Sequence, residues 1–222
     1  MPTAMILKEV HLQTADLAAT TAFYAELLEL PIQAQTETSV AFRVGFSLLS
    51  FRLSNAAQRP FYHFAFTIPS NQVAEAHAWI SARTTILPAP EGGTILDFPN
   101  WNAKAFYFHD PNGNILECIA RFDLPNAVAN GFSSACFLGL NEIGLPTPNA
   151  PQSAEAIHRQ YDVPYFVRGP RLPEFVVMGD DTGLFIMPTI GRGWLPTGRP
   201  AERFGIRVVF EEKGKTRVID YQ

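Results

Sequence analysis

Glu117 is the residue whose surroundings in the sequence most clearly suggest chemistry. It lies in a predicted strand, residues 115–121, directly after the turn sequence Asp110-Pro111-Asn112-Gly113. Because side chains alternate between the faces of a strand, Glu117 shares one face with Ile115 and Ile119. The other face carries Leu116, Cys118 and Ala120. A carboxylate between apolar neighbours is costly unless it is paired or binds a metal ion, so Glu117 is either a metal ligand or an edge residue that reaches solvent.

The elements around Glu117 repeat along the chain. A strand, a helix and three strands are predicted over residues 5–53, and the same order returns over 60–121. The segment 122–134 is rich in Asn, Gly and Ser and is typical of a linker. Internal repetition of this kind indicates one supersecondary unit used more than once.

A third copy of the unit is expected over residues 138–190. Residues 8–16 align with 141–149, which places Glu9 in register with Glu142. One more strand follows at 204–211. We therefore expect an α+β protein of repeated βαβββ units, with two parts: residues 1–122 as a complete domain and 135–222 as a shortened repeat.

Composition excludes several classes of function. The chain has 222 residues, 47% of them hydrophobic, and a net charge of −4 without any basic cluster, which argues against a nucleic-acid partner. No apolar run approaches the length that crosses a membrane. Two cysteines, Cys118 and Cys136, make no disulfide framework, so a reducing cytoplasm is the expected location.

Four features together resemble the vicinal oxygen chelate superfamily. They are the repeated βαβββ unit, the strand–Asp16–Leu17–helix opening with Phe23-Tyr24, the aromatic strand 61–66, and the Asp-Pro-Asn-Gly-Asn turn before Glu117. That superfamily includes glyoxalase I, extradiol ring-cleaving dioxygenases, fosfomycin-resistance enzymes and bleomycin-binding proteins. The resemblance implies curved, mixed β-sheets that form a cavity, with two units paired around one divalent metal ion.

The resemblance also implies a ligand set. His63 and Glu117 match ligand positions on the first and last strands of the second unit. In the first unit the usual His position, seven residues before the Asp that opens the helix, is Glu9, and His11 follows on the same strand face. We therefore expect His63, Glu117 and at least one of Glu9 and His11 to bind Fe, Mn, Ni or Zn. The remaining member of that pair would act as a general base or orient a ligand.

Other interpretations of these residues stay open. His63 could be a hydrogen-bonded core histidine, and His11 could simply fill the sheet. The third unit repeats Glu9 as Glu142 but has Gly144 in place of His11, so no second metal site is expected there.

The expected function is that of a metal-dependent enzyme of the glyoxalase or ring-cleaving dioxygenase type, acting on a small oxygen-chelating organic substrate. Ser50, Trp101 and Tyr107 are expected at the substrate pocket, although Ser50 in place of a fourth ligand argues against a glyoxalase I site. The alternative is a metal-free protein that binds a drug or metabolite, as bleomycin-resistance proteins do. We expect a small-molecule substrate, no nucleic-acid or membrane partner, and a second part that packs on the first or helps to form a homodimer.

Overall fold

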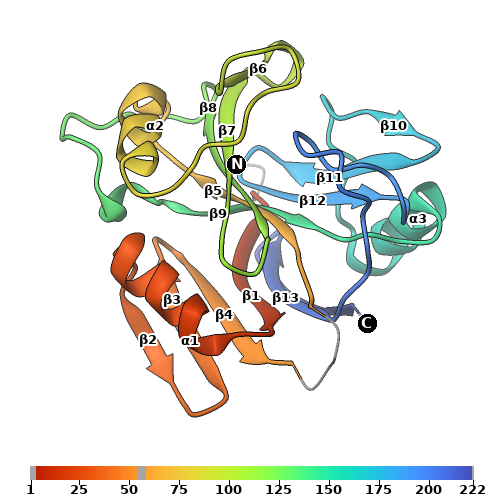
Figure 1. Ribbon diagram of the computed structural model, residues 1–222. Coiled ribbons are helices and arrows are strands. Elements are labelled where there is room, and N and C mark those ends of the chain that lie inside the picture. Colours follow the sequence, from red (N-terminus) through yellow and green to blue (C-terminus); the bar gives the residue numbers. More distant parts are fainter. Residues whose placement is uncertain (1–3, 55–58, 222) are drawn as a thin grey trace.

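The strands of the protein join into one mixed sheet. The computed structural model describes residues 4–54 and 59–221, and within them fourteen strands are hydrogen-bonded into a continuous sheet (Figure 1). Three helices pack on it, and the elements repeat in the order that the sequence predicts.

The first two units each have the order βαβββ. The first consists of β1 (Ile6–Thr14), α1 (Leu17–Thr21) with the π-helical turn η1 (Ala22–Leu27), β2 (Ile32–Gln35), β3 (Ser39–Val44) and β4 (Ser47–Leu53). The second consists of β5 (His63–Thr67), α2 (Val73–Ser81), β6 (Leu96–Phe98), the short helix η2 (Pro99–Trp101), β7 (Ala103–His109) and β8 (Ile115–Arg121).

The third unit has the same order. After η3 (Ser134–Cys136) it consists of β9 (Gly139–Gly144), α3 (Ala150–Tyr161), β10 (Arg171–Leu172), β11 (Phe175–Asp180) and β12 (Gly183–Pro188). The hairpin β13 (Ile206–Glu212) and β14 (Lys215–Tyr221) follows. The predicted α+β fold of repeated βαβββ units is confirmed.

Capping side chains start two of the helices at matching positions. Asp16 accepts a hydrogen bond from the amide of Ala19 at 2.9 Å, and Asn149 accepts one from Gln152 at 3.0 Å. Such caps satisfy amides that have no partner inside a helix. Each cap lies seven residues after a strand glutamate, Glu9 or Glu142, so the aligned segments of the first and third units have the same local structure.

The units pair differently from the expectation. We expected the cavity between residues 5–53 and 60–121, whereas β9 of the third unit lies antiparallel against β5 of the second, and β13 lies antiparallel against β1 (Figure 1). All six residues of β9 are buried. A strand that is buried on both faces belongs in a sheet interior, and β9 accordingly lies between β1 and β5.

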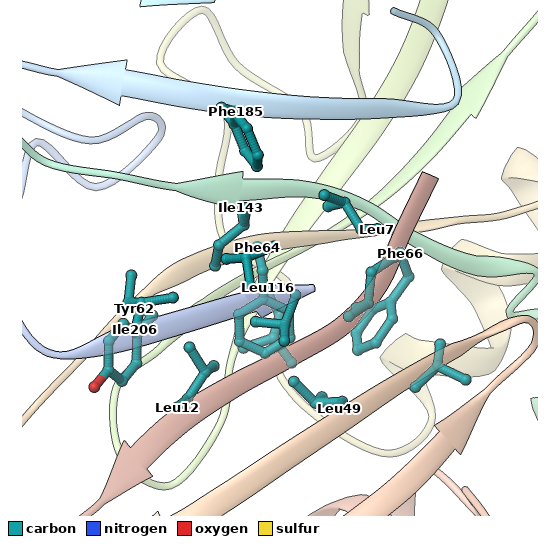
Figure 2. Packing of buried hydrophobic residues seen from close by; sticks show 14 of the residues in the cluster. Leu7, Leu12, Leu49, Tyr62, Phe64, Phe66, Leu116, Ile143, Phe185 and Ile206 are labelled. Atoms are coloured by element: carbon teal, nitrogen blue, oxygen red, sulfur yellow. The ribbon is translucent and has the colours of Figure 1, made fainter. Parts of the chain in front are cut away.

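Alternation along β5 and β8 separates two hydrophobic clusters. Phe64, Phe66 and Leu116 belong to the larger core, which also contains residues of α2 and α3 and is shown in Figure 2. Ala65 and Ile119 point to the opposite side, into a smaller cluster with Trp194. The predicted two faces of residues 115–121 are therefore correct, and Glu117 lies on the side of the smaller cluster.

None of the helices in the described part of the chain is both long enough and apolar enough to cross a membrane. Cys118 and Cys136 are buried, free thiols.

Candidate metal centre and its cavity

A buried turn fixes where β8 begins and therefore which way Glu117 points. Asp110 accepts hydrogen bonds from the amides of Asn112 and Asn114, both at 2.9 Å, and from the hydroxyl of Tyr24 at 2.9 Å. Gly113 has φ +77°, a conformation that glycine adopts without strain. The next strand enters in parallel register with β5, with His63 opposite Ile115.

Three ionisable side chains meet at the side of the sheet that carries the smaller cluster. The Nε2 atom of His63 lies 3.6 Å from Glu117 Oε2 and 4.0 Å from Glu142 Oε2. One potential ligand atom from each residue lies within 4.8 Å of the others. They come from β5, β8 and β9, so the pairing of the second unit with the third creates the cluster.

His63 presents an unprotonated nitrogen to the two carboxylates. Its Nδ1 lies 3.0 Å from the backbone oxygen of Ile115, and a backbone carbonyl can only accept, so Nδ1 carries the proton. Burial lowers the pKa of His63 to about 4, which keeps the ring neutral near pH 7. A neutral imidazole with one nitrogen fixed by a carbonyl is the form in which histidine binds metal ions.

The two carboxylates lie in surroundings that disfavour charge. Burial raises the pKa of Glu117 well above its usual value, and the nearby charge of Glu142 adds to that shift. Burial also raises the pKa of Glu142, against the opposing effect of Arg121. Two carboxylates this close and this poorly solvated require a compensating cation or proton.

The cluster forms the floor of a cavity of about 450 Å³. Its walls are mostly apolar or aromatic, with a few polar groups from loops. They include Phe98, Asn100, Trp101, Tyr107, Ile119, Arg168, Phe175, Ile186, Arg192 and Trp194. The volume and the mixture of apolar walls with few convergent polar groups are typical of small-molecule sites.

Trp194 packs directly on His63. The ring centroids are 4.9 Å apart, and Trp194 is only 5% exposed. Gly144 makes room for the indole, because a Cβ atom there would lie 2.7 Å from Trp194 Cη2. The glycine that replaces a histidine in the alignment with the first unit therefore allows an aromatic wall beside the cluster.

The structure brings together some of the sequence-predicted site residues and not others. His63, Glu117, Trp101 and Tyr107 belong to the cavity described above. Glu9, His11 and Ser50 lie together elsewhere, on the face that β1, β4 and β13 share.

Glu142 is the member of the cluster that sequence reasoning missed. The sequence alignment of residues 8–16 with 141–149 already places Glu142 in register with Glu9. Because Gly144 stands where the first unit has His11, we expected no metal site in the third unit. The missing information was that β9 pairs with β5, which places Glu142 opposite Ala65, two residues after His63.

The geometry fits one metal ion. Ligand atoms bound at ~2.0–2.2 Å to a common ion lie roughly 3–4 Å apart, as the His63 nitrogen and the two carboxylate oxygens do. One neutral imidazole and two carboxylates suit Zn, Mn, Fe or Ni, and leave open positions towards the cavity. The three residues could therefore hold a divalent ion, whose identity the donor set leaves open.

Comparison with known proteins establishes the fold. No protein-family model matches the sequence, and no curated protein matches it. Among solved structures, a proposed dioxygenase from Bacillus subtilis strain 168 aligns over 99% of this chain and 86% of its own, with a TM-score of 0.65 and 14% identity. At that identity the likeness shows a shared fold and nothing about activity.

Two further structures align over about half of the chain. A lactoylglutathione lyase from Agrobacterium tumefaciens is 22% identical over 50% of this chain and 90% of its own, with a TM-score of 0.42. The fosfomycin resistance protein FosX from Listeria monocytogenes, solved with Mn(II) and sulfate, is 20% identical over 52% and 89%, with a TM-score of 0.41. The fold itself is confirmed by the Bacillus subtilis structure, which aligns over nearly the whole chain.

Proposed function

We propose that this protein is a divalent-metal-dependent enzyme that acts on a small organic substrate with neighbouring oxygen atoms, in the manner of glyoxalases or ring-cleaving dioxygenases. One observation carries the proposal: a neutral histidine nitrogen faces two buried carboxylates at the floor of a small-molecule cavity. Structural carboxylates are seldom buried in this way without a cation between them.

His63, Glu117 and Glu142 would hold the ion. When bound, a divalent ion supplies Lewis-acid polarisation of substrate oxygens, or oxygen chemistry if it is Fe(II). The protein's own contribution is to fix the ligands: Ile115 orients His63 through its carbonyl, and Arg121 holds the outer oxygen of Glu142 at 2.6 Å.

The walls of the cavity would select and orient the substrate. Trp101, Trp194 and Phe175 offer flat apolar faces and restrict water at the floor. Tyr107 lies opposite Glu117 in the β7–β8 register, and its hydrogen bond to that carboxylate opposes the rise in the pKa of Glu117. Burial raises the pKa of Tyr107 itself, so its hydroxyl stays protonated and serves as a donor.

A second candidate is a metal-free protein that binds a small molecule in the same cavity. The ion pair between Arg121 and Glu142 favours it, because that pair already compensates one of the two carboxylates without a metal ion. A proton on Glu117, which its raised pKa favours, would compensate the other.

Metal analysis separates the two candidates. The protein should be purified without a polyhistidine tag or chelator, and bound metals measured by mass spectrometry. We expect about one divalent ion per chain in the wild type and a large loss in His63→Ala, Glu117→Gln and Glu142→Gln. Glu9→Gln is the matched control, because Glu9 occupies the same position in the first unit and lies outside the cavity.

Activity is then tested on the metal-loaded protein. The protein should be loaded anaerobically with Fe(II), and in separate samples with Mn(II), Ni(II) or Zn(II). Each sample should then be screened against catechols and thiol–aldehyde adducts. Turnover that disappears in Glu117→Gln supports the enzyme. Tight ligand binding without turnover under any metal would instead support the metal-free candidate.

A further inference from the structure

A second cavity lies on the face that β1, β4 and β13 share. It measures about 710 Å³, and we call it the arginine groove. Its lining residues are His11, Leu12, Gln13, Ser50, Arg52, Arg203, Phe204, Gly205, Ile206, Arg207 and Asp220. Figure 1 shows β1 lying between β4 and β13, and in the sheet order β9 and β5 separate β1 from β8. None of its lining residues also lines the cavity of the metal centre.

Strand registers relate the groove to the metal centre. In the second unit, Ile115 pairs with His63, and Glu117 follows two residues later; in the first, Leu48 pairs with Glu9, and Ser50 follows two residues later. Ser50 therefore occupies the place of Glu117.

The third ligand position is related in the same way. Glu142 on β9 lies opposite Ala65, two residues after His63, and Arg207 on β13 lies opposite His11, two residues after Glu9. A guanidinium thus stands in the groove where the metal centre has a carboxylate. The arginine groove and the metal centre therefore share their strand registers, but arginine occupies in the groove a position that glutamate occupies in the metal centre.

The groove is positively charged in a chain whose net charge is −4. Three arginines and one aspartate line it, two positive charges in excess. Asp220 forms an ion pair with Arg207. Nη1 of Arg207 donates to both carboxylate oxygens of Asp220, at 2.8 and 3.0 Å. Arg203 lies 4.5 Å over the ring of Tyr221, and neither Arg203 nor Arg52 has a carboxylate partner within the described ranges 4–54 and 59–221.

A chain of side-chain hydrogen bonds fixes the polar floor. Nε2 of His11 lies 2.9 Å from Glu9 Oε2, and Nδ1 lies 2.6 Å from Ser50 Oγ. The carboxylate of Glu9 is therefore engaged by His11, which reduces its repulsion of an anion. Ser50 is held at the base of the groove, two residues from Arg52 on the same face of β4.

We propose that the arginine groove binds a small anion carrying a carboxylate or phosphate group, with Arg52 and Arg203 supplying the charge. Guanidinium groups present paired donors that match the oxygens of such anions. Arg207 provides further donors along the wall. The site is independent of the metal centre and of the function proposed for it.

Titration calorimetry of the full chain tests the proposal. Inorganic phosphate and succinate should be titrated separately into chelator-treated protein at constant ionic strength. We expect saturable binding of at least one anion, and an affinity at least ten-fold lower in Arg52→Gln and in Arg203→Gln. Both side chains are exposed, so these substitutions leave the packing of the sheet intact.

Two controls decide the result. Arg43→Gln removes an exposed arginine of β3 outside the groove and should bind as the wild type does, as should Glu117→Gln at the metal centre. Binding of phosphate alone or succinate alone supports the site and identifies the anionic group. No saturable binding of either anion, or an equal loss in Arg43→Gln, overturns it.

Discussion

The guanidinium of Arg121 donates to Glu142 at 2.6 Å between Nη2 and Oε1, from a position with no exposure to solvent. The other oxygen of Glu142 is the one that lies 4.0 Å from the His63 nitrogen. Arg121 also donates from Nε to Asn141 at 2.9 Å. One carboxylate thus has two roles: one oxygen anchors a buried cation, and the other faces the cavity.

Removing Arg121 should destabilise the protein strongly. In Arg121→Met the charge of Glu142 would remain buried without a partner, and breaking a buried pair in this way costs about 3–5 kcal/mol. Urea unfolding measures the loss. The double variant Arg121→Met/Glu142→Gln should recover part of it. Arg159→Gln removes a surface pair with Glu155 and should lower the free energy of unfolding by less than about 1 kcal/mol. An equal decrease in Arg121→Met and Arg159→Gln would contradict the argument.

Gly144→Ala should displace Trp194 from His63. The added Cβ would lie 2.7 Å from Trp194 Cη2 and 3.2 Å from the His63 carbonyl, so the indole must move. We expect a loss of roughly 1–3 kcal/mol in the free energy of unfolding and a shift in tryptophan fluorescence.

The matched control for that substitution is Gly131→Ala. A Cβ atom at residue 131 would meet nothing within 4 Å. Wild-type fluorescence and stability are expected there. If Gly144→Ala leaves the fluorescence unchanged, the close contact of Gly144 with Trp194 is not what positions the indole.

Local patterns in the sequence were sufficient to predict the elements of each unit. Asp16, where the sequence predicts that the first helix opens, caps that helix, and the turn at Asp110 leads into β8 as predicted. The alternation along residues 115–121 also placed Glu117 on the correct face. All of these features depend on residues within a few positions of one another.

The partner of each unit could not be predicted in the same way. Whether β5 pairs with β1 or with β9 depends on contacts between residues about eighty positions apart, such as Phe64 with Ile143. Any of the three glutamates Glu9, Glu117 and Glu142 could join a cluster with His63 by residue type alone. Only the strand order decides that Glu142 does and Glu9 does not.

Metal binding should stabilise the fold measurably. A ligand at 100 times its Kd raises the free energy of unfolding by about 2.7 kcal/mol when only the folded state binds it. The wild type should therefore unfold at a higher urea concentration with added Zn(II) or Mn(II), and EDTA should reverse the effect. Glu142→Gln should lose this stabilisation, and Glu9→Gln should keep it. If instead Glu9→Gln loses it and Glu142→Gln keeps it, Glu9 rather than Glu142 is the metal ligand.

Glu212 should make stability depend on pH. Burial, together with the nearby charge of Asp180, raises the pKa of Glu212 to about 7. Its Oε2 atom has no hydrogen-bond partner among the residues that the structure describes. The folded state therefore favours the protonated carboxyl more than the unfolded state does. The resulting stabilisation is fully present below about pH 4.5, the ordinary value, and is lost as the pH rises through about 7.

Glu212→Gln tests this dependence directly. The variant cannot ionise at residue 212, so it should be more stable than the wild type at pH 8. A pKa of about 7 in place of 4.5 corresponds to about 3–4 kcal/mol, and solvent screening lowers this to roughly 2–3 kcal/mol. The difference should shrink towards zero near pH 4. Urea unfolding at half-unit pH intervals measures both curves.

Glu211→Gln is the matched control, since the neighbouring Glu211 points to the other face of β13, 3.8 Å from Lys8. If the curves of Glu212→Gln and the wild type run parallel from pH 4 to 8, Glu212 does not titrate in this range.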